Sequence, residues 1–201
     1  PLPPPPPFSS ETREDPSTSG TAPAGLTTML VSDHPHLFET GGENYHTDFD
    51  AWEYERGHEN DPWKTVPDPT WMGTPSLPAR SRGDHYDTHR TYFRAEQDYP
   101  GPKVMRTAVD WLERNAEHHE RFFLLLDEFD PHEPFDTPEP WAHKYDPDWD
   151  DELIIWPPYS TKTAERGVLT AREAFHVRAN YGAKLSLIDQ HRKSTRLHPR
   201  H

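Results

Sequence analysis

Residues 122–126 read Phe122-Phe123-Leu124-Leu125-Leu126, an apolar run of strand length with no polar alternation. Such a run is typical of a buried, central strand in a parallel or mixed sheet whose two faces are both covered. Residues 103–119 precede it with an amphipathic pattern in which Val104, Ala108 and Leu112 fall on one helical stripe. A helix followed at once by a buried strand predicts an α/β fold with a mixed, mostly parallel sheet flanked by helices.

Two further segments support this α/β pattern. Residues 27–31 are rich in strand formers and predict a second strand. Residues 171–190 predict a second helix, since Thr170 and Glu173 match a capping box at its start. Its expected apolar stripe consists of Ala174, Val177, Tyr181, Leu185 and Ile188. Between these elements, residues 41–94 predict long irregular loop with one helical turn near residues 50–56.

The composition divides the chain into three parts. Residues 1–25 are rich in Pro, Ser, Thr and Gly without periodicity, and we expect them to be disordered. The basic segment 191–201 has no apolar stripe and is expected to fray, which leaves residues 26–190 as a partial domain. Leu, Ile, Val and Phe account for 32 of the 201 residues, fewer than most folded domains contain. We therefore expect an aromatic core, together with an apolar patch left exposed on the sheet.

The charge balance excludes several classes of partner. With 21 basic and 35 acidic side chains, the chain has a net charge of −14 and repels nucleic acid and anionic membrane surfaces. No segment is long and apolar enough to predict a membrane helix. The absence of cysteine excludes disulfides, thiolate metal sites and a Cys nucleophile.

The strongest candidate site directly follows the 122–126 strand, where residues 130–135 read Asp130-Pro131-His132-Glu133-Pro134-Phe135. In α/β sheets, ligands bind beyond the carboxyl ends of the strands. Each X-Pro step extends the residue before it, so His132 lies on a stiffened turn between carboxylates. These surroundings favour a cationic imidazole that could donate to an anionic oxygen. A solvated acidic turn with a structural histidine explains the same pattern.

A second histidine cluster follows the 27–31 strand, in the segment Asp33-His34-Pro35-His36. Histidines two positions apart on an extended chain point to the same side, so they could act together. Two ligands are too few for a metal site, and we assign no metal ligands.

These segments also resemble bacterial sulfatases of the alkaline phosphatase superfamily. The resemblance lies in Thr27-Thr28-Met29-Leu30-Val31-Ser32-Asp33-His34-Pro35-His36, Gly57-His58-Glu59-Asn60-Asp61-Pro62-Trp63, the stretch from Phe122 to Tyr145, and Asn180-Tyr181-Gly182-Ala183-Lys184 running to Asp189. It spans about residues 26–190 in the order of that family. The resemblance implies an alkaline phosphatase-like α/β fold and hydrolysis of small-molecule or carbohydrate sulfate esters by a formylglycine nucleophile.

The resemblance also implies roles for individual residues. His132 matches the substrate-contacting histidine of the family's His-Glu-Pro turn, and we assign it as the catalytic candidate. His34 and His36 fall where many members have a Lys-Trp-His motif, with Asp33 at the place of the lysine, and are assigned to substrate binding. The family binds a divalent cation, typically calcium, through acidic residues whose counterparts are not identifiable in this chain.

The chain departs from the family at the nucleophile. A Cys-x-Pro-Ser-Arg motif is expected before Leu26, where a proline-rich tract stands instead. The segment Ser76-Leu77-Pro78-Ala79-Arg80 fits the pattern loosely but follows the Asp33–His36 segment and does not begin a helix. We therefore expect a sulfatase-like fragment with little or no turnover of its own. The alternative is a non-catalytic acidic module whose aromatic loops bind carbohydrate or a protein. A sulfatase-like chain should hold His132 and the Asp33–His36 segment at one site, whereas a binding module need not.

Overall fold

The computed structural model describes residues 25–39, 41, 44–70, 79–80, 85–159 and 166–194. The predictions made for residues 1–24, Ser76 and residues 195–201 fall outside these ranges. The described elements are β1 (Thr27–Ser32), η1 (Pro35–Leu37), η2 (Tyr45–Asp48), β2 (Ala51–Tyr54), α1 (His85–Arg90), η3 (Glu96–Asp98), α2 (Pro100–Asn115), η4 (Ala116–His118), β3 (Phe122–Asp127) and α3 (Ala171–Ser194), where η denotes a 3₁₀ helix. No helix within these ranges is long and apolar enough to cross a membrane.

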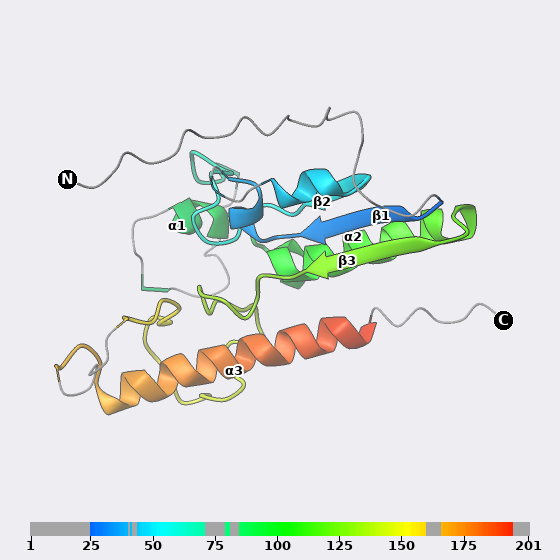
Figure 1. The fold of residues 1–201 in the computed structure, drawn as a ribbon. Coiled ribbons are helices and arrows are strands. Elements are labelled where there is room, and N and C mark those ends of the chain that lie inside the picture. The colour runs from blue at the N-terminus through cyan, green and yellow to red at the C-terminus, as the bar shows by residue number, and fades with distance from the viewer. Residues whose placement is uncertain are drawn as a thin grey trace, which may run out of the picture.

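The fold is a small α/β arrangement around a parallel three-stranded sheet with strand order β2-β1-β3 (Figure 1). β1 pairs in parallel with β3 from Thr27↔Phe122 to Ser32↔Asp127, in agreement with the expectation of a mostly parallel sheet. The expected antiparallel component is not found, because all three described strands are parallel. The predicted helical turn near residues 50–56 is wrong: Ala51–Tyr54 is strand β2, and its Trp52 pairs with Leu30 of β1.

β3 lies at an edge of the sheet, and the prediction of a central strand covered on both faces is wrong. Leu124 packs against the cluster formed by Met29, Val31 and Val104 beneath α2. The exposed large side chains of β3 are Phe122, Phe123, Leu125 and Leu126. The apolar run therefore reflects a strand that is only partly covered within the described residues, and the expected apolar patch on the sheet is present there.

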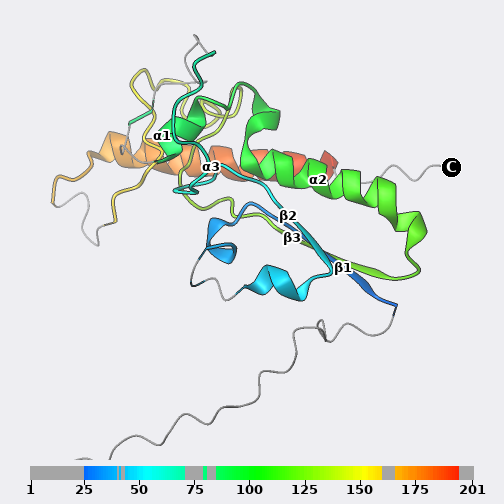
Figure 2. The same ribbon diagram turned by 90° about the horizontal axis from the view of Figure 1, so that it is seen from above.

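Helices and short 3₁₀ segments lie on opposite sides of the sheet. α2 covers one face with Val104 and Ala108, which are both buried, and η1 and η2 lie on the other side (Figure 2). α2 starts at Pro100, three residues before the predicted start, and proline is well tolerated in a first turn because its missing N–H has no intrahelical partner there. α3 packs against α2 on the same side of the sheet.

α3 begins with the predicted capping box. The backbone N–H of Glu173 donates to Thr170 Oγ1 at 3.1 Å, and the N–H of Thr170 donates to Glu173 Oε2 at 2.8 Å. The helix continues to Ser194, so the predicted fraying after Gln190 is wrong for residues 191–194. Arg192 and Lys193 of this last turn reach back to Asp189, which stabilises it.

The predicted apolar stripe of α3 is correct only in its first part, where Val177 is buried and Ala174 packs against the same core cluster. Tyr181 and Leu185 are exposed, whereas the buried face includes the polar residues His176, Asn180 and Lys184. These three residues recur every four positions and form hydrogen bonds to the irregular segment 130–156. This face of α3 is therefore buried because its side chains hydrogen bond to loops. Hydrophobic periodicity does not detect such a face.

The largest core cluster is aromatic, as the composition predicts. It lies beside the sheet, where α1 and the segment after α1 pack against the irregular chain that follows β3. Its buried members are Tyr86, Phe93, Tyr99, Ala142, Leu153, Ile155 and Trp156.

Candidate functional site

The candidate site lies where β1 and β3 end side by side. Because the two strands are parallel, the segments that follow them, residues 33–37 and 128–135, leave the sheet at the same edge. Asp33 joins the two segments: its Oδ1 accepts the backbone N–H of Phe129 at 2.7 Å. Asp33 is fully buried, so it acts as a structural tie between the two segments.

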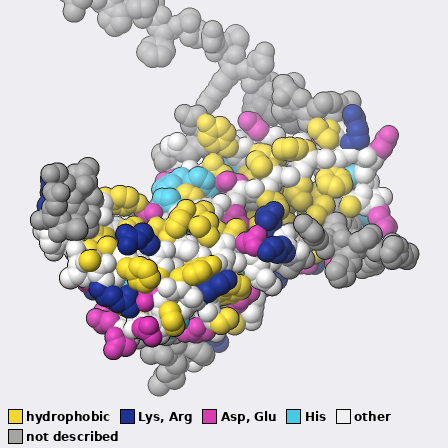
Figure 3. Space-filling view, turned by 90° about the horizontal axis from the view of Figure 1, so that it is seen from below, with side chains coloured by type: hydrophobic (Ala, Val, Ile, Leu, Met, Phe, Trp, Pro, Cys, Tyr) yellow, Lys and Arg dark blue, Asp and Glu magenta, His cyan; other side chains and the backbone are white. Residues whose placement is uncertain are grey.

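The ring of Phe129 lies between two of the predicted histidines. His34 stacks on it with ring centroids 4.2 Å apart, and His132 stacks on it at 4.3 Å. The rings of His36 and His58 meet Phe129 edge-on, at 5.8 and 4.9 Å. The three histidines assigned from the sequence are therefore brought together around one phenylalanine. Figure 3 shows histidine side chains gathered on the surface of this region.

His34 and His132 each have one ring nitrogen engaged. Nδ1 of His34 lies 3.2 Å from Asp127 Oδ2, and Nδ1 of His132 donates to the carbonyl oxygen of Glu133 at 2.8 Å. The Nε2 atoms of both rings have no hydrogen-bond partner among the described residues. Both side chains are partly exposed, 27% for His34 and 38% for His132, so solvent and ligands can reach them.

His36 is placed differently. Its Nδ1 contacts Glu39 and its Nε2 lies 3.4 Å from Glu59 Oε2, so both nitrogens face carboxylates. A sulfate group would meet electrostatic repulsion at this ring. The structure thus brings His36 to the site but does not leave it free to bind an anion.

A buried ion pair lies beneath the exposed histidines. Asp130 Oδ1 lies 2.5 Å from Lys184 Nζ and accepts a hydrogen bond from His58 Nε2 at 2.7 Å. Burial lowers the pKa of His58 to about 4, so this histidine is neutral at pH 7 and donates from Nε2. Burial acts to raise the pKa of Asp130, but the Lys184 ammonium and the hydrogen bond from His58 outweigh it and lower the pKa.

Lys184 also fixes the backbone of the His132 turn. Its ammonium donates to the carbonyl oxygen of Pro134 at 2.6 Å and to that of His132 at 3.2 Å. One buried cation from α3 therefore neutralises Asp130 and positions the turn that presents His132.

Two more carboxyl groups lie nearby, those of Asp33, which is fully buried, and Glu128, which is partly buried. Burial, together with the charge of Asp130, raises the pKa of Glu128 to about 8 and raises that of Asp33 well above its usual range. Glu128 packs against Gly101 so closely that a Cβ at this glycine would collide with the carboxyl group. Glu128 is therefore held in its neutral, protonated form at pH 7, and burial favours the neutral form of Asp33 as well.

The residues present do not fit the calcium ion that the sulfatase resemblance implies. No group of three or more His, Asp or Glu side chains in the described parts of the chain is arranged to hold a metal ion. Asp130, the carboxylate at the centre of the buried cluster, is already neutralised by Lys184. No step considered below uses a metal.

A cleft with a different lining lies on the side of the sheet that carries η1 and η2. It encloses about 730 Å³, and its aromatic lining residues are Phe38, His46, Trp52 and Tyr54. Phe38 stacks on Tyr54 at 4.1 Å, and His46 meets Trp52 edge-on at 4.7 Å. Trp52 is 45% exposed, so part of its ring surface remains accessible.

Sequence reasoning did not single out Phe129, Lys184 or His58 as site residues. His58 and Lys184 lie in the stretches that resemble sulfatases, and the spacing of His176, Asn180 and Lys184 was a further signal of a polar helix face. Nothing in the sequence indicated that Phe129 would separate two histidine rings. Comparison with known proteins gives no further guidance, because no family model, no curated protein and no solved structure matches the chain.

Proposed function

We propose that this chain is a sulfatase-like, anion-binding portion of an alkaline phosphatase-like α/β domain, and that it binds the sulfate group of a small-molecule or carbohydrate sulfate ester. The observation that supports the proposal is the stacking of His34 and His132 on Phe129, where their Nε2 atoms have no hydrogen-bond partner within the described part of the chain. Each ring, once protonated, has one N–H available to a sulfate oxygen, and such charge-assisted hydrogen bonds are among the stronger ones in proteins.

His132 is the residue that we expect to contribute most. Its Nδ1 donates to the Glu133 carbonyl, so Nε2 is the ring nitrogen that can face a ligand, and no described residue hydrogen bonds to it. The carbonyl oxygens of His132 and Pro134 accept from Lys184, which keeps the turn in place when the ligand binds. Lys184 is thus a positioning residue in this proposal.

The proposal covers binding and does not extend to efficient hydrolysis. A general acid or base contributes about 10²–10⁴-fold to a rate, whereas most of the stabilisation of a sulfatase transition state comes from the nucleophile and the metal. The described residues supply histidines but no calcium site, so we expect sulfate-ester binding without measurable turnover.

The test is a titration of the full chain with an aryl sulfate, followed by NMR of ¹⁵N-labelled histidine rings. We expect saturable shifts of the His34 and His132 resonances and stronger binding as the pH falls from about 8 to about 5.5, where histidine gains its charge. His132→Ala should weaken binding about tenfold or more, in line with the loss of a charge-assisted hydrogen bond.

His143→Ala is the matched control, because this histidine pairs with Glu139 away from the Phe129 stack. It should leave the affinity unchanged. Equal weakening by both substitutions, or binding that does not depend on pH, would contradict the proposal.

One observation favours a second candidate function, a non-catalytic module that binds uncharged carbohydrate in the cleft lined by Trp52. Sugar rings stack on exposed aromatic faces, and Glu53 beside Trp52 could accept hydrogen bonds from hydroxyl groups. Binding of a neutral oligosaccharide that is lost in Trp52→Ala but retained in His132→Ala would support this alternative. The opposite pattern with an aryl sulfate supports the sulfate-binding proposal.

A further inference from the structure

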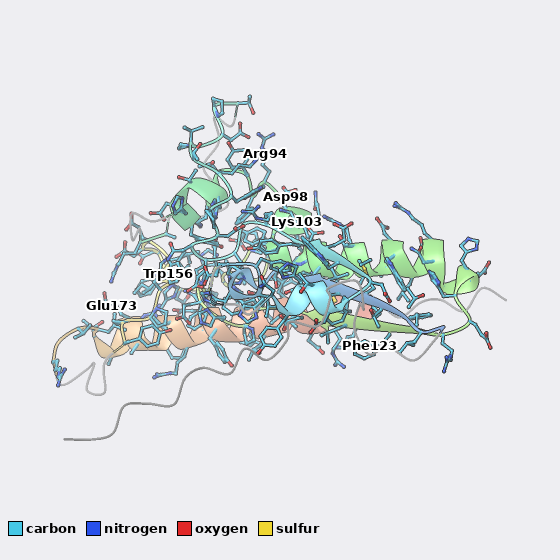
Figure 4. The ribbon with its side chains drawn as sticks, turned by 45° about the horizontal axis from the view of Figure 1, so that its top comes forward. Arg94, Asp98, Lys103, Phe123, Trp156 and Glu173 are labelled. Carbon is cyan, nitrogen blue, oxygen red and sulfur yellow. The ribbon has the colours of Figure 1, made fainter. Side chains whose placement is uncertain are left out.

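β3 combines two features that are rarely left exposed together, an unpaired edge and a row of large apolar side chains. It hydrogen bonds to β1 on one side, and no described strand pairs with its other side. Phe122, Phe123, Leu125 and Leu126 are 37–50% exposed. Figure 4 shows Phe123 on the side of the sheet that faces away from α2, and Figure 3 shows hydrophobic side chains gathered on this part of the surface.

Edge strands of this length usually carry a device that prevents pairing with another chain, such as a proline, a bulge or an inward-pointing charge. Residues 122–126 contain no proline and no charged residue, and their unbroken one-to-one register with β1 contains no bulge. The first charged residues are Arg121 before the apolar run and Asp127 after it. The strand thus has opposite charges at its two ends and only Phe and Leu between them.

This arrangement is self-complementary in one antiparallel register. When two copies of the strand pair about Leu124, each Phe122 lies opposite Leu126 and each Phe123 lies opposite Leu125. Arg121 then lies opposite Asp127 of the partner subunit, at both ends of the pair. Shifting the register by two residues in either direction places one of these charges opposite Phe or Leu.

We propose that β3 pairs with β3 of a second copy of this chain, which gives a two-fold symmetric dimer with a continuous six-stranded sheet. Strand pairing across such an axis is isologous, because the same edge is used by both copies. Directly opposite side chains in an antiparallel pair lie close enough for the aromatic–aliphatic and opposite-charge pairs to stabilise it. The proposal does not rest on sulfate binding, although Asp127 also contacts His34 of the candidate site.

The first test is the mass of the full chain in solution, measured by sedimentation equilibrium over a concentration series. We expect a monomer–dimer equilibrium for the native chain and a monomer for Leu125→Lys, which places a charge opposite Phe123. Leu185→Lys, on the exposed face of α3, is the matched control and should remain dimeric. A native chain that stays monomeric at its highest soluble concentration overturns the proposal. It would instead indicate that β3 pairs with a strand of a different polypeptide.

The second test addresses the register. Arg121→Asp and Asp127→Arg should each dimerise at least about tenfold more weakly alone, because each places like charges opposite one another at both ends of the strand pair. An equimolar mixture should form a heterodimer, since Asp at position 121 of one variant then faces Arg at position 127 of the other. Circular dichroism establishes that each variant is folded. A dimer of undiminished affinity in both single variants, or a mixture of folded variants that dimerises no better than either alone, would rule out this register.

Discussion

Single side chains hold the candidate site together through the segments on which they lie. Asp33 ties the segment after β1 to the segment after β3, and Lys184 connects α3 to the His132 turn. Phe129 separates the two accessible imidazoles and so sets their spacing. The histidines predicted from the sequence, His34, His36 and His132, are accordingly the partly exposed residues of the site. The buried residues Asp33, Asp130 and Lys184 hold their segments in place.

Glu128 makes the stability of the protein depend on pH. The burial of this carboxyl raises its pKa from 4.5 to about 8, so the folded chain retains a proton that the unfolded chain releases. Stability contributed by this proton is fully present below pH 4.5 and is lost as the pH rises towards 8. Glu128→Gln mimics the protonated group, so urea unfolding near pH 8 should show a variant more stable than the native chain by about 4 kcal/mol, less the part that solvent screening of this partly exposed group removes.

The comparison between the two proteins isolates this one group. Their unfolding free energies should converge towards pH 4.5 and stop diverging above about pH 8. A constant difference across this range would show that Glu128 keeps an ordinary pKa in the folded state.

Lys184 is expected to be the most sensitive single position of the site. Lys184→Met retains an unbranched side chain of similar length but leaves Asp130 buried without its cation and two carbonyls without a donor. Loss of one partner of a buried pair costs about 3–5 kcal/mol, measurable by urea unfolding. Adding Asp130→Asn should recover part of this loss, whereas Arg178→Met on the exposed face of the same helix should change stability by less than about 0.5 kcal/mol.

At the scale of elements, local signals were sufficient wherever the deciding contacts are local. The boundaries of β3 and the capping box at Thr170 follow from residues adjacent in sequence, and the structure confirms them. The buried face of α3 could not be predicted, because His176, Asn180 and Lys184 are selected by partners that lie 26 to 52 positions away in the sequence. For the same reason the sequence identified His132 but not the lysine that holds its turn.

The capping box gives a prediction at this scale. Thr170→Ala removes the hydroxyl that accepts from the Glu173 N–H, and loss of such a cap costs about 1 kcal/mol. Urea unfolding should show this decrease, and hydrogen exchange should show faster opening of the first turn of α3. Thr65→Ala, at an exposed position with no such bond, is the control. Equal effects of the two substitutions would mean that the box contributes nothing beyond an ordinary surface threonine.

At the scale of the whole molecule, the sequence predicted the α/β class and the aromatic core but misplaced β3 within the sheet. An apolar run of Phe and Leu is equally compatible with a covered central strand and with a partly exposed edge strand. Strand β2 was missed because Ala51–Tyr54 is short and mostly exposed, so it lacks the hydrophobic signal of a strand. Both errors concern contacts between segments, which set the strand order and which composition does not encode.

The net charge of −14 makes salt a test that separates the two proposals. Two copies of so acidic a chain repel each other over their whole surfaces, whereas the Arg121–Asp127 pairs are local and worth only about 0.2–1 kcal/mol each. Screening shortens the range of this repulsion from about 30 Å at 0.01 M salt to about 10 Å at 0.1 M. We therefore expect added NaCl to strengthen dimerisation of the native chain in sedimentation experiments and to weaken aryl sulfate binding to His34 and His132. Leu125→Lys should show only the second effect. A dimer that weakens as salt rises would mean that the terminal charge pairs, and not the apolar contacts between them, provide most of its stability.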